Sequence, residues 1–403
     1  MHRKLFAWLL LIASLLNVWL PAGRAWSQST VEILTSSVAY QFGESLTFQA
    51  VFRADQPIQE VHVLFNSADG AFSGSGKAQT VSGKSYAYTY GLENSPLRPF
   101  SRVDYRFQVL LADGTLVNTS DRSFIYRDNR FEWFTAAEDN LTVRLDRADP
   151  AFAAETLAVA QTALERIKEL GVQAPQENVE IYVYSSAASM QEALDLIGPG
   201  WSAGHANPDL GIVLVTLPQG PQQRLVMEQR IPHELMHVML FRMLGAGYFL
   251  LPAWLSEGLA TAAELYPNPD YQVLLEDARQ AGKLLNFSSL CEIFPRETSQ
   301  TLLAYAQAGS FMRFLEKRFG SSGIQALLNS YASGTDCAAG TEAALGQPLN
   351  RLEREWRQQV FGENPTWLII ANLMPWIVIL IAVLSAPVAL FFYAWRKRPV
   401  ITT

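Results

Sequence analysis

Two histidines four residues apart carry the clearest chemical signal in this sequence. His233 and His237 enclose Glu234 in the pattern H-E-L-M-H, and the apolar residues around the pattern are typical of a buried helix. Residues four apart share one face of a helix, so the two imidazoles can bind one cation. Glu234 lies about 100° around the helix from His233, where its carboxylate can reach a water on that cation without being a ligand.

A third ligand is expected from the segment that follows. Nineteen residues separate His237 from Glu257, which lies in the sequence L-P-A-W-L-S-E-G-L-A. Pro252 suits the first turn of a new helix, which would carry Glu257 inward. Three protein ligands leave the fourth zinc position open for water, which is the arrangement of a catalytic site.

These two motifs resemble those of the gluzincins, zinc peptidases that take two histidines from HExxH and a glutamate from the next helix. In detail the sequence resembles the peptidase MA-like domain family, a distant relative of aminopeptidase N and of thermolysin-type enzymes. The resemblance covers roughly residues 131 to 361. It implies one zinc ion per chain with His233, His237 and Glu257 as ligands, and Glu234 as the general base.

Other residues are candidates for the same site. Glu264 lies seven residues after Glu257, where it can orient a ligand histidine or form an ordinary surface ion pair. Tyr305 is a candidate catalytic donor because related enzymes often have a tyrosine in this helix, and core packing is the alternative. His205 is a further candidate. Ser256 stands where many relatives carry asparagine, and the G-A-M-E-N signature of aminopeptidase N is absent, so aminopeptidase specificity is not implied.

The elements that must position these residues are mixed strands and helices, which predict an α+β, zincin-like metallopeptidase domain over residues 131–363. The strand at 211–217 is expected at the sheet edge beside the metal, where an extended peptide can add as a further strand, although its apolar residues also suit a central strand. The other predicted strands are 141–145 and 179–184, the predicted helices are 150–170 and 190–197, and helices dominate from about 222 to 348.

Residues 28–130 have a different pattern. About seven short alternating segments separated by turn residues predict an antiparallel β-sandwich of the immunoglobulin or fibronectin type III kind. The region has no cysteine, which excludes an antibody-type domain. It shows no ligand chemistry, so a spacer or docking role is expected.

Both ends of the chain are hydrophobic. Residues 1–27 have the basic start, apolar centre and small-x-small exit of a secretory signal peptide, with an uncleaved anchor as the alternative. No charged residue occurs between Glu363 and Arg396, and residues 366–395 are predicted to form one transmembrane helix. The basic tail, residues 396–403, is expected in the cytoplasm, which places the rest of the protein outside.

The overall composition excludes several classes of protein. With 49% hydrophobic and 17% charged residues the chain is neither disordered nor collagen-like, and its net charge of −7 argues against nucleic-acid binding. Two cysteines are too few for a disulfide framework or a thiolate zinc site. Cys291 and Cys337 both lie on the exported side, where a disulfide and two buried thiols are equally compatible with the sequence.

Together these features predict a membrane-anchored extracytoplasmic zinc metallopeptidase that acts on a peptide or protein. A zinc-activated water, deprotonated by Glu234, would attack the peptide carbonyl, and Glu234 would then protonate the leaving amine. The alternative is a catalytically inert zincin-fold scaffold that displays the β-sandwich to a partner. An intramembrane protease is disfavoured because Glu228 and Arg242 flank the motif and no second long apolar span exists.

Overall fold

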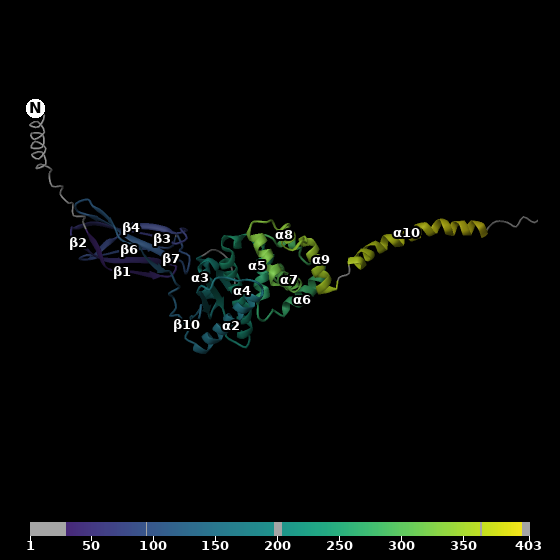
Figure 1. The fold of residues 1–403 in the computed structure, drawn as a ribbon, viewed down its shortest axis with the longest axis horizontal. Coiled ribbons are helices and arrows are strands. Elements are labelled where there is room, and N and C mark those ends of the chain that lie inside the picture. Colours follow the sequence, from purple (N-terminus) through teal and green to yellow (C-terminus); the bar gives the residue numbers. More distant parts are fainter. Residues whose placement is uncertain (1–29, 94, 197–203, 363–364, 397–403) are drawn as a thin grey trace, which may run out of the picture. The chain divides into compact units, whose positions relative to one another are not determined.

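The computed structural model describes residues 30–93, 95–196, 204–362 and 365–396, and the chain forms two compact units. The first unit ends at Arg130 and the second begins at Phe131 (Figure 1). The predicted signal peptide and most of the predicted cytoplasmic tail lie outside the described residues.

Two antiparallel sheets make up the described part of the first unit. Their strand orders are β1-β2-β6-β5 and β4-β3-β7-β8, with β9 paired to β7. Every second residue along most of β2, β3 and β7 is buried, as expected for strands with one face on a core. The strands are β1 (Val31–Gln41), β2 (Ser45–Ala54), β3 (Ile58–Ser67), β4 (Ser73–Lys77), β5 (Gln79–Ser82), β6 (Ser85–Gly91), β7 (Arg102–Leu111), β8 (Leu116–Asn118) and β9 (Arg122–Ile125).

Aromatic side chains fill the space between these two sheets. Phe48 of β2 stacks on Phe65 of β3 with ring centroids 4.8 Å apart, and Phe52 of β2 meets Phe107 of β7 at 5.5 Å. Within residues 30–130 the structure has nine strands where alternation predicts about seven, because several added strands are short and polar. The assignment to the immunoglobulin or fibronectin type III kind stays a prediction.

A five-stranded mixed sheet forms the start of the second unit. Its order is β10-β11-β12-β14-β13, with β11, β12 and β14 parallel and the two edge strands antiparallel to their neighbours. Helices α2 and α4 pack against this sheet and against each other. The strands are β10 (Phe134–Glu138), β11 (Leu141–Leu145), β12 (Val179–Tyr184), β13 (Gly204–Asn207) and β14 (Ile212–Thr216).

The expectation that residues 211–217 form the sheet edge is wrong. Strand β14 lies between β12 and β13, and all five of its residues are buried. The edge belongs to β13, which pairs with β14 over the sequence G-H-A-N. This short segment lacks the apolar alternation that marks a strand, so the sequence pattern did not reveal it.

Helices make up the rest of the second unit. Helix α2 begins at Pro150, and the side chain of Asp149 accepts a hydrogen bond from the amide of Phe152 as its N-cap. The helices are α2 (Pro150–Glu169), α3 (Ala187–Asp195), α4 (Gln223–Leu244), α5 (Ala253–Ala263), α6 (Asp270–Gln280), α7 (Thr298–Ala332), α8 (Gly340–Leu345) and α9 (Leu349–Phe361), with 3-10 turns η2 (Pro208–Leu210), η3 (Gly245–Leu250) and η4 (Phe287–Leu290).

Helix α10 (Pro365–Arg396) is the one helix in the described ranges that is long and apolar enough to cross a membrane. Its most apolar window, Leu373–Leu390, has a mean hydropathy of 2.4. Two prolines, Pro375 and Pro387, lie inside it, and a membrane helix tolerates such interruptions better than a soluble one.

Candidate metal centre

Helix α4 presents the two predicted histidine ligands on one face. The ring centroids of His233 and His237 are 5.3 Å apart, and their side chains are 16% and 9% exposed. Ile231, Leu235 and Leu240 of the same helix are completely buried. These apolar neighbours fix the helix in the core, so the two imidazoles are held in place by packing.

Pro232, in the middle of α4, leaves one backbone oxygen of this helix available for a hydrogen bond from the end of α5. Proline has no amide hydrogen, so the carbonyl oxygen of Glu228 loses its usual helical donor. That oxygen instead accepts a hydrogen bond from the amide of Leu265 at 2.9 Å. Leu265 follows Glu264, and the bond therefore fixes the end of α5 beside His233.

Helix α5 brings Glu257 to the histidine pair. Its Oε2 atom lies 3.4 Å from Nε2 of His233 and 3.6 Å from Nε2 of His237. One nitrogen or oxygen from each of the three side chains lies within 4.8 Å of the other two, which is close enough for all three to hold one metal ion. Two imidazole nitrogens and one carboxylate oxygen form a donor set that suits zinc.

Two glycines allow α5 to approach α7 closely. A Cβ atom at Gly258 would lie 2.8 Å from a backbone oxygen of α7, and a Cβ atom at Gly309 of α7 would collide with Thr261 of α5. The absence of side chains at these positions brings the two helices together. Glu257 of α5 and Tyr305 of α7 consequently line one pocket.

The second nitrogen of each histidine also has a partner. Nδ1 of His233 lies 3.5 Å from Oε1 of Glu264, whose side chain is 6% exposed, so Glu264 does not form the surface ion pair considered from the sequence. Nδ1 of His237 is 3.1 Å from the hydroxyl of Tyr248 in η3. Such contacts fix the orientation of a ring and keep its other nitrogen, Nε2, aimed toward Glu257.

Glu234 lies against the edge strand β13. A Cβ atom at Gly204 would fall 2.6 Å from Oε1 of Glu234, so glycine leaves room for this carboxylate. Burial raises the pKa of Glu234, and electrostatic interaction with the neighbouring His233 and His237 opposes that rise. His205, the next residue of β13, is half-buried and is not part of the cluster formed by His233, His237 and Glu257.

The histidines and acids of the candidate metal centre shift one another's pKa values. Burial alone would lower the pKa of His233, but its hydrogen bonds to Glu257 and Glu264 outweigh burial and raise it. Burial alone would raise the pKa of Glu257, whereas the neighbouring His237 and His233 hold it well below its usual range. The carboxylate of Glu257 is therefore ionised.

A pocket of about 330 Å³ opens beside Glu257. Tyr305 lies on its wall, with its ring centroid 5.9 Å from that of His233. Burial raises the pKa of the Tyr305 hydroxyl far above neutral pH, which keeps it a hydrogen-bond donor. Tyr248 and Phe294 also line this pocket.

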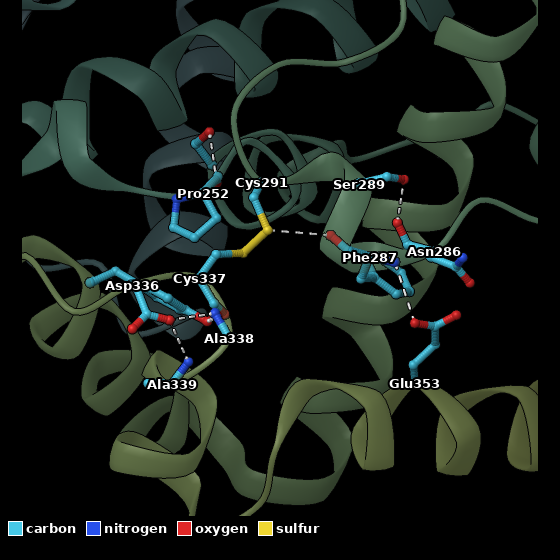
Figure 2. Close-up of a disulfide and its surroundings, with 12 residues drawn as sticks. Pro252, Asn286, Phe287, Ser289, Cys291, Asp336, Cys337, Ala338, Ala339 and Glu353 are labelled. Atoms are coloured by element: carbon cyan, nitrogen blue, oxygen red, sulfur yellow. Dashed lines mark hydrogen bonds between the residues drawn. A yellow bond between two sulfur atoms is a disulfide. The ribbon is translucent and has the colours of Figure 1, made fainter.

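Sequence reasoning missed two parts of this site. Tyr248 gave no signal by spacing, because it reaches His237 from a 3-10 turn rather than from the same helix. The residues after Cys291 that line the pocket were missed as well, because a disulfide and the start of α5 place them there. The bridge joins Cys291 to Cys337 (Figure 2). Ala253 donates its amide to the carbonyl of Cys291 at 2.9 Å.

Comparisons with solved structures give only weak similarities. The aminopeptidase N family protein from Idiomarina loihiensis is 8% identical, with 81% of this chain and 76% of that one covered and a TM-score of 0.37. BhCBM56 is 12% identical over 23% of this chain and 89% of its own, with a TM-score of 0.18. OgpA from Akkermansia muciniphila is 13% identical, with a TM-score of 0.19 over 24% of this chain, which spans 28% of the OgpA chain.

Sequence comparison is more informative. No curated protein matches this chain. A family model does match, and its description is the Peptidase MA superfamily. The match covers residues 159–362, which include α4, α5 and α7 and amount to just over half of the chain. The resemblance found from the two motifs is confirmed, and the chain belongs to the Peptidase MA superfamily.

Proposed function

We propose that the chain is a membrane-anchored zinc metallopeptidase that hydrolyses peptide bonds outside the cytoplasm. The observation that carries the proposal is the convergence of His233, His237 and Glu257 within 4.8 Å, beside Glu234, in a member of a peptidase superfamily. Zinc bound by these three residues would polarise the peptide carbonyl and make the attacking water more acidic.

Glu234 is the general base of the proposed reaction. Its carboxylate faces β13 on the same helix as the two histidines, and burial raises its pKa, which makes it a stronger base. One carboxylate oxygen would accept a proton from the attacking water and then donate it to the leaving amine nitrogen. Glu264 and Tyr248 would hold the rings of His233 and His237 in the orientation that binding requires.

Tyr305 would donate its hydroxyl hydrogen to the oxygen of the attacked carbonyl. The phenol lies near His233 and remains protonated because burial raises its pKa. A donor aimed at developing negative charge lowers the barrier more than one that binds the ground state.

Helix α10 would anchor the chain in the bilayer. Its length and the mean hydropathy of 2.4 over Leu373–Leu390 support a single crossing, and the basic residues at its end favour a cytoplasmic end. The two sheets of the first unit support a β-sandwich of the immunoglobulin or fibronectin type III kind, acting as a spacer or docking domain.

Metal analysis combined with a cleavage assay tests the proposal. The purified full chain in detergent should contain about one zinc per chain and cut peptides until a chelator is added. Glu234→Gln should keep its zinc but lose about 10²- to 10⁴-fold in activity, because it removes only the proton acceptor. His233→Ala and Glu257→Ala should lose the zinc itself.

Two outcomes would contradict this assignment. Loss of zinc from Glu234→Gln, or full activity in that variant, would show that Glu234 is not the base. Zinc binding by the parent without cleavage of any peptide would favour the inert scaffold that displays the β-sandwich.

A further inference from the structure

The pocket beside Glu257 has two aromatic walls. Tyr248 and Phe249 of η3 form one wall, with ring centroids 5.3 Å apart. Phe294 and Tyr305 form the other, with centroids 5.1 Å apart. Its volume of about 330 Å³ is at the lower end of the range of about 300 to 1,000 Å³ that is usual for ligand sites.

Large apolar side chains are unusually exposed around this pocket. Phe249 is 70% exposed, Leu250 is 54% exposed and Ile293 is 65% exposed. Phe249 and Ile293 line the pocket, and Leu250 adjoins Phe249 in η3. Exposed apolar groups that gather at one place mark a surface that is covered during function.

The charge of the pocket restricts what can enter it. Glu257 and Glu292 are acidic, and none of the described lining residues is lysine or arginine. An acidic side chain entering the pocket would therefore be repelled by Glu292 and would find no basic side chain on the lining. A large uncharged side chain would instead replace water on the aromatic walls.

The wall formed by residues 292–294 is held by covalent and backbone bonds. The disulfide Cys291–Cys337 joins the start of this segment to the chain between α7 and α8, and Figure 2 shows the bridge next to Pro252. The carbonyl of Cys291 accepts from the amide of Ala253, the first residue of the helix that carries Glu257. The pocket wall and the candidate ligand are thus fixed to each other.

We infer that this pocket is a specificity subsite that takes one large apolar side chain of a peptide substrate, next to the bond that is cut, and rejects acidic side chains. The inference rests on the proposed function. The occupant is a substrate side chain, because Glu257 and Tyr305 form part of the pocket and make it continuous with the candidate metal centre.

Cleavage of a random-sequence peptide mixture by the purified full chain tests this subsite. Phe, Tyr, Trp, Leu, Ile and Met should be enriched at one fixed position beside the cut bond. Asp and Glu should be depleted there by about 10- to 100-fold, the discrimination that a shaped apolar pocket gives. A flat profile, or enrichment of acidic residues at that position, would overturn the inference.

Ile293→Asp tests the pocket itself. Ile293 is exposed, so the substitution adds a charge at the wall with little effect on folding. The kcat/KM of apolar peptides should fall by about 10-fold, mainly through KM, because a charge now stands where the side chain binds. Val273→Asp is the matched control, since Val273 is 62% exposed on α6 and does not line the pocket. Equal effects of the two variants would contradict the assignment.

Binding to Glu234→Gln separates this inference from the proposed function. Fluorescence anisotropy should show that a labelled hexapeptide with one phenylalanine binds about 10-fold or more tightly than its alanine analogue, and that adding Ile293→Asp removes the difference. Selective binding without cleavage by the parent would end the peptidase proposal but keep the subsite. Equal binding of the two peptides would end the subsite even if the parent cuts peptides.

Discussion

The two units of the chain differ in how many titratable side chains they bury. In the first unit the core consists of apolar and aromatic side chains, and ion pairs such as Lys77–Glu60 lie at the surface with side chains 51% and 35% exposed. In the second unit two histidines and two glutamates come together in the interior, with Glu264 only 6% exposed.

The first unit has one instructive exception. Asp128 is buried, but Arg130 binds both of its carboxylate oxygens, at 2.9 and 2.6 Å. The guanidinium of Arg130 neutralises the carboxylate of Asp128, and both carboxylate oxygens have a hydrogen-bond donor. In the second unit one oxygen of Glu264 is buried without a hydrogen-bond partner in the structure.

The cluster of buried charge in the second unit lowers its stability and therefore indicates a functional role. Burying charge costs free energy, so a chain that keeps several acids and imidazoles inside one unit keeps them for another purpose. The described residues of the first unit contain no comparable cluster of acids and imidazoles, and its core consists mainly of apolar and aromatic side chains.

Loss of the disulfide should destabilise the second unit alone. Replacing Cys291 and Cys337 by serine opens a loop with a sequence separation of 46, and the free energy of unfolding should fall by about 4 kcal/mol. Tryptophan fluorescence reports this unit, because residues 30–130 contain no tryptophan while Trp254 and Trp356 are fully buried in the second unit.

Circular dichroism of the sheets in the first unit is the control for the same denaturant titration. Its transition should not move in the double variant, since no contact of the first unit changes. A fluorescence midpoint equal to that of the parent would show that the bridge contributes nothing to the unit.

The contacts behind the two histidines should tune zinc affinity. Glu264→Gln and Tyr248→Phe should each weaken zinc binding by about 10- to 100-fold, because each loosens one imidazole while all three candidate ligands remain. Competition with a zinc-binding dye measures the affinity. Glu165→Gln and Tyr266→Phe are matched controls, since Glu165 and Tyr266 are exposed and lie outside the cluster. Unchanged affinity in Glu264→Gln would make the buried carboxylate a purely structural group.

The sequence predicts local features of this molecule well. The spacing of His233 and His237 places both on one face of α4, and the position after Pro252 places Glu257 in α5. Their roles as ligands stay predictions, but the chain brings them together as the pattern implied. The strands at 141–145 and 179–184 have the predicted bounds, because buried β-branched residues mark them.

Features that depend on distant parts of the chain could not be predicted. The sequence could not decide whether Cys291 and Cys337 pair, because their sequence separation is 46 and nothing local sets the distance between their Cβ atoms. Strand β13 exists only because β14 pairs with it, and its four residues have no pattern of their own. The position of the pocket wall after Cys291 likewise depends on the hydrogen bond that the amide of Ala253 donates to the carbonyl of Cys291.

The smallest expected effect concerns the first unit, where Tyr126 is its clearest buried titratable group. The hydroxyl accepts a hydrogen bond from the amide of Gly43 at 2.6 Å, and burial raises the pKa of Tyr126 from its usual 10.0 to about 12. Because the folded pKa lies above the unfolded one, this group's contribution to stability is complete below pH 10 and is lost as the pH rises toward 12.

Tyr126→Phe should lower stability by a constant amount below pH 10, since Gly43 loses its acceptor, and the difference in stability from the parent should narrow between pH 10 and 12. Denaturant midpoints from circular dichroism at several pH values measure this gap, while tryptophan fluorescence of the second unit should show no difference between the two chains. A gap that stays constant up to pH 12 would mean that the phenol is not held neutral by burial, and that the first unit tolerates a charge in its core.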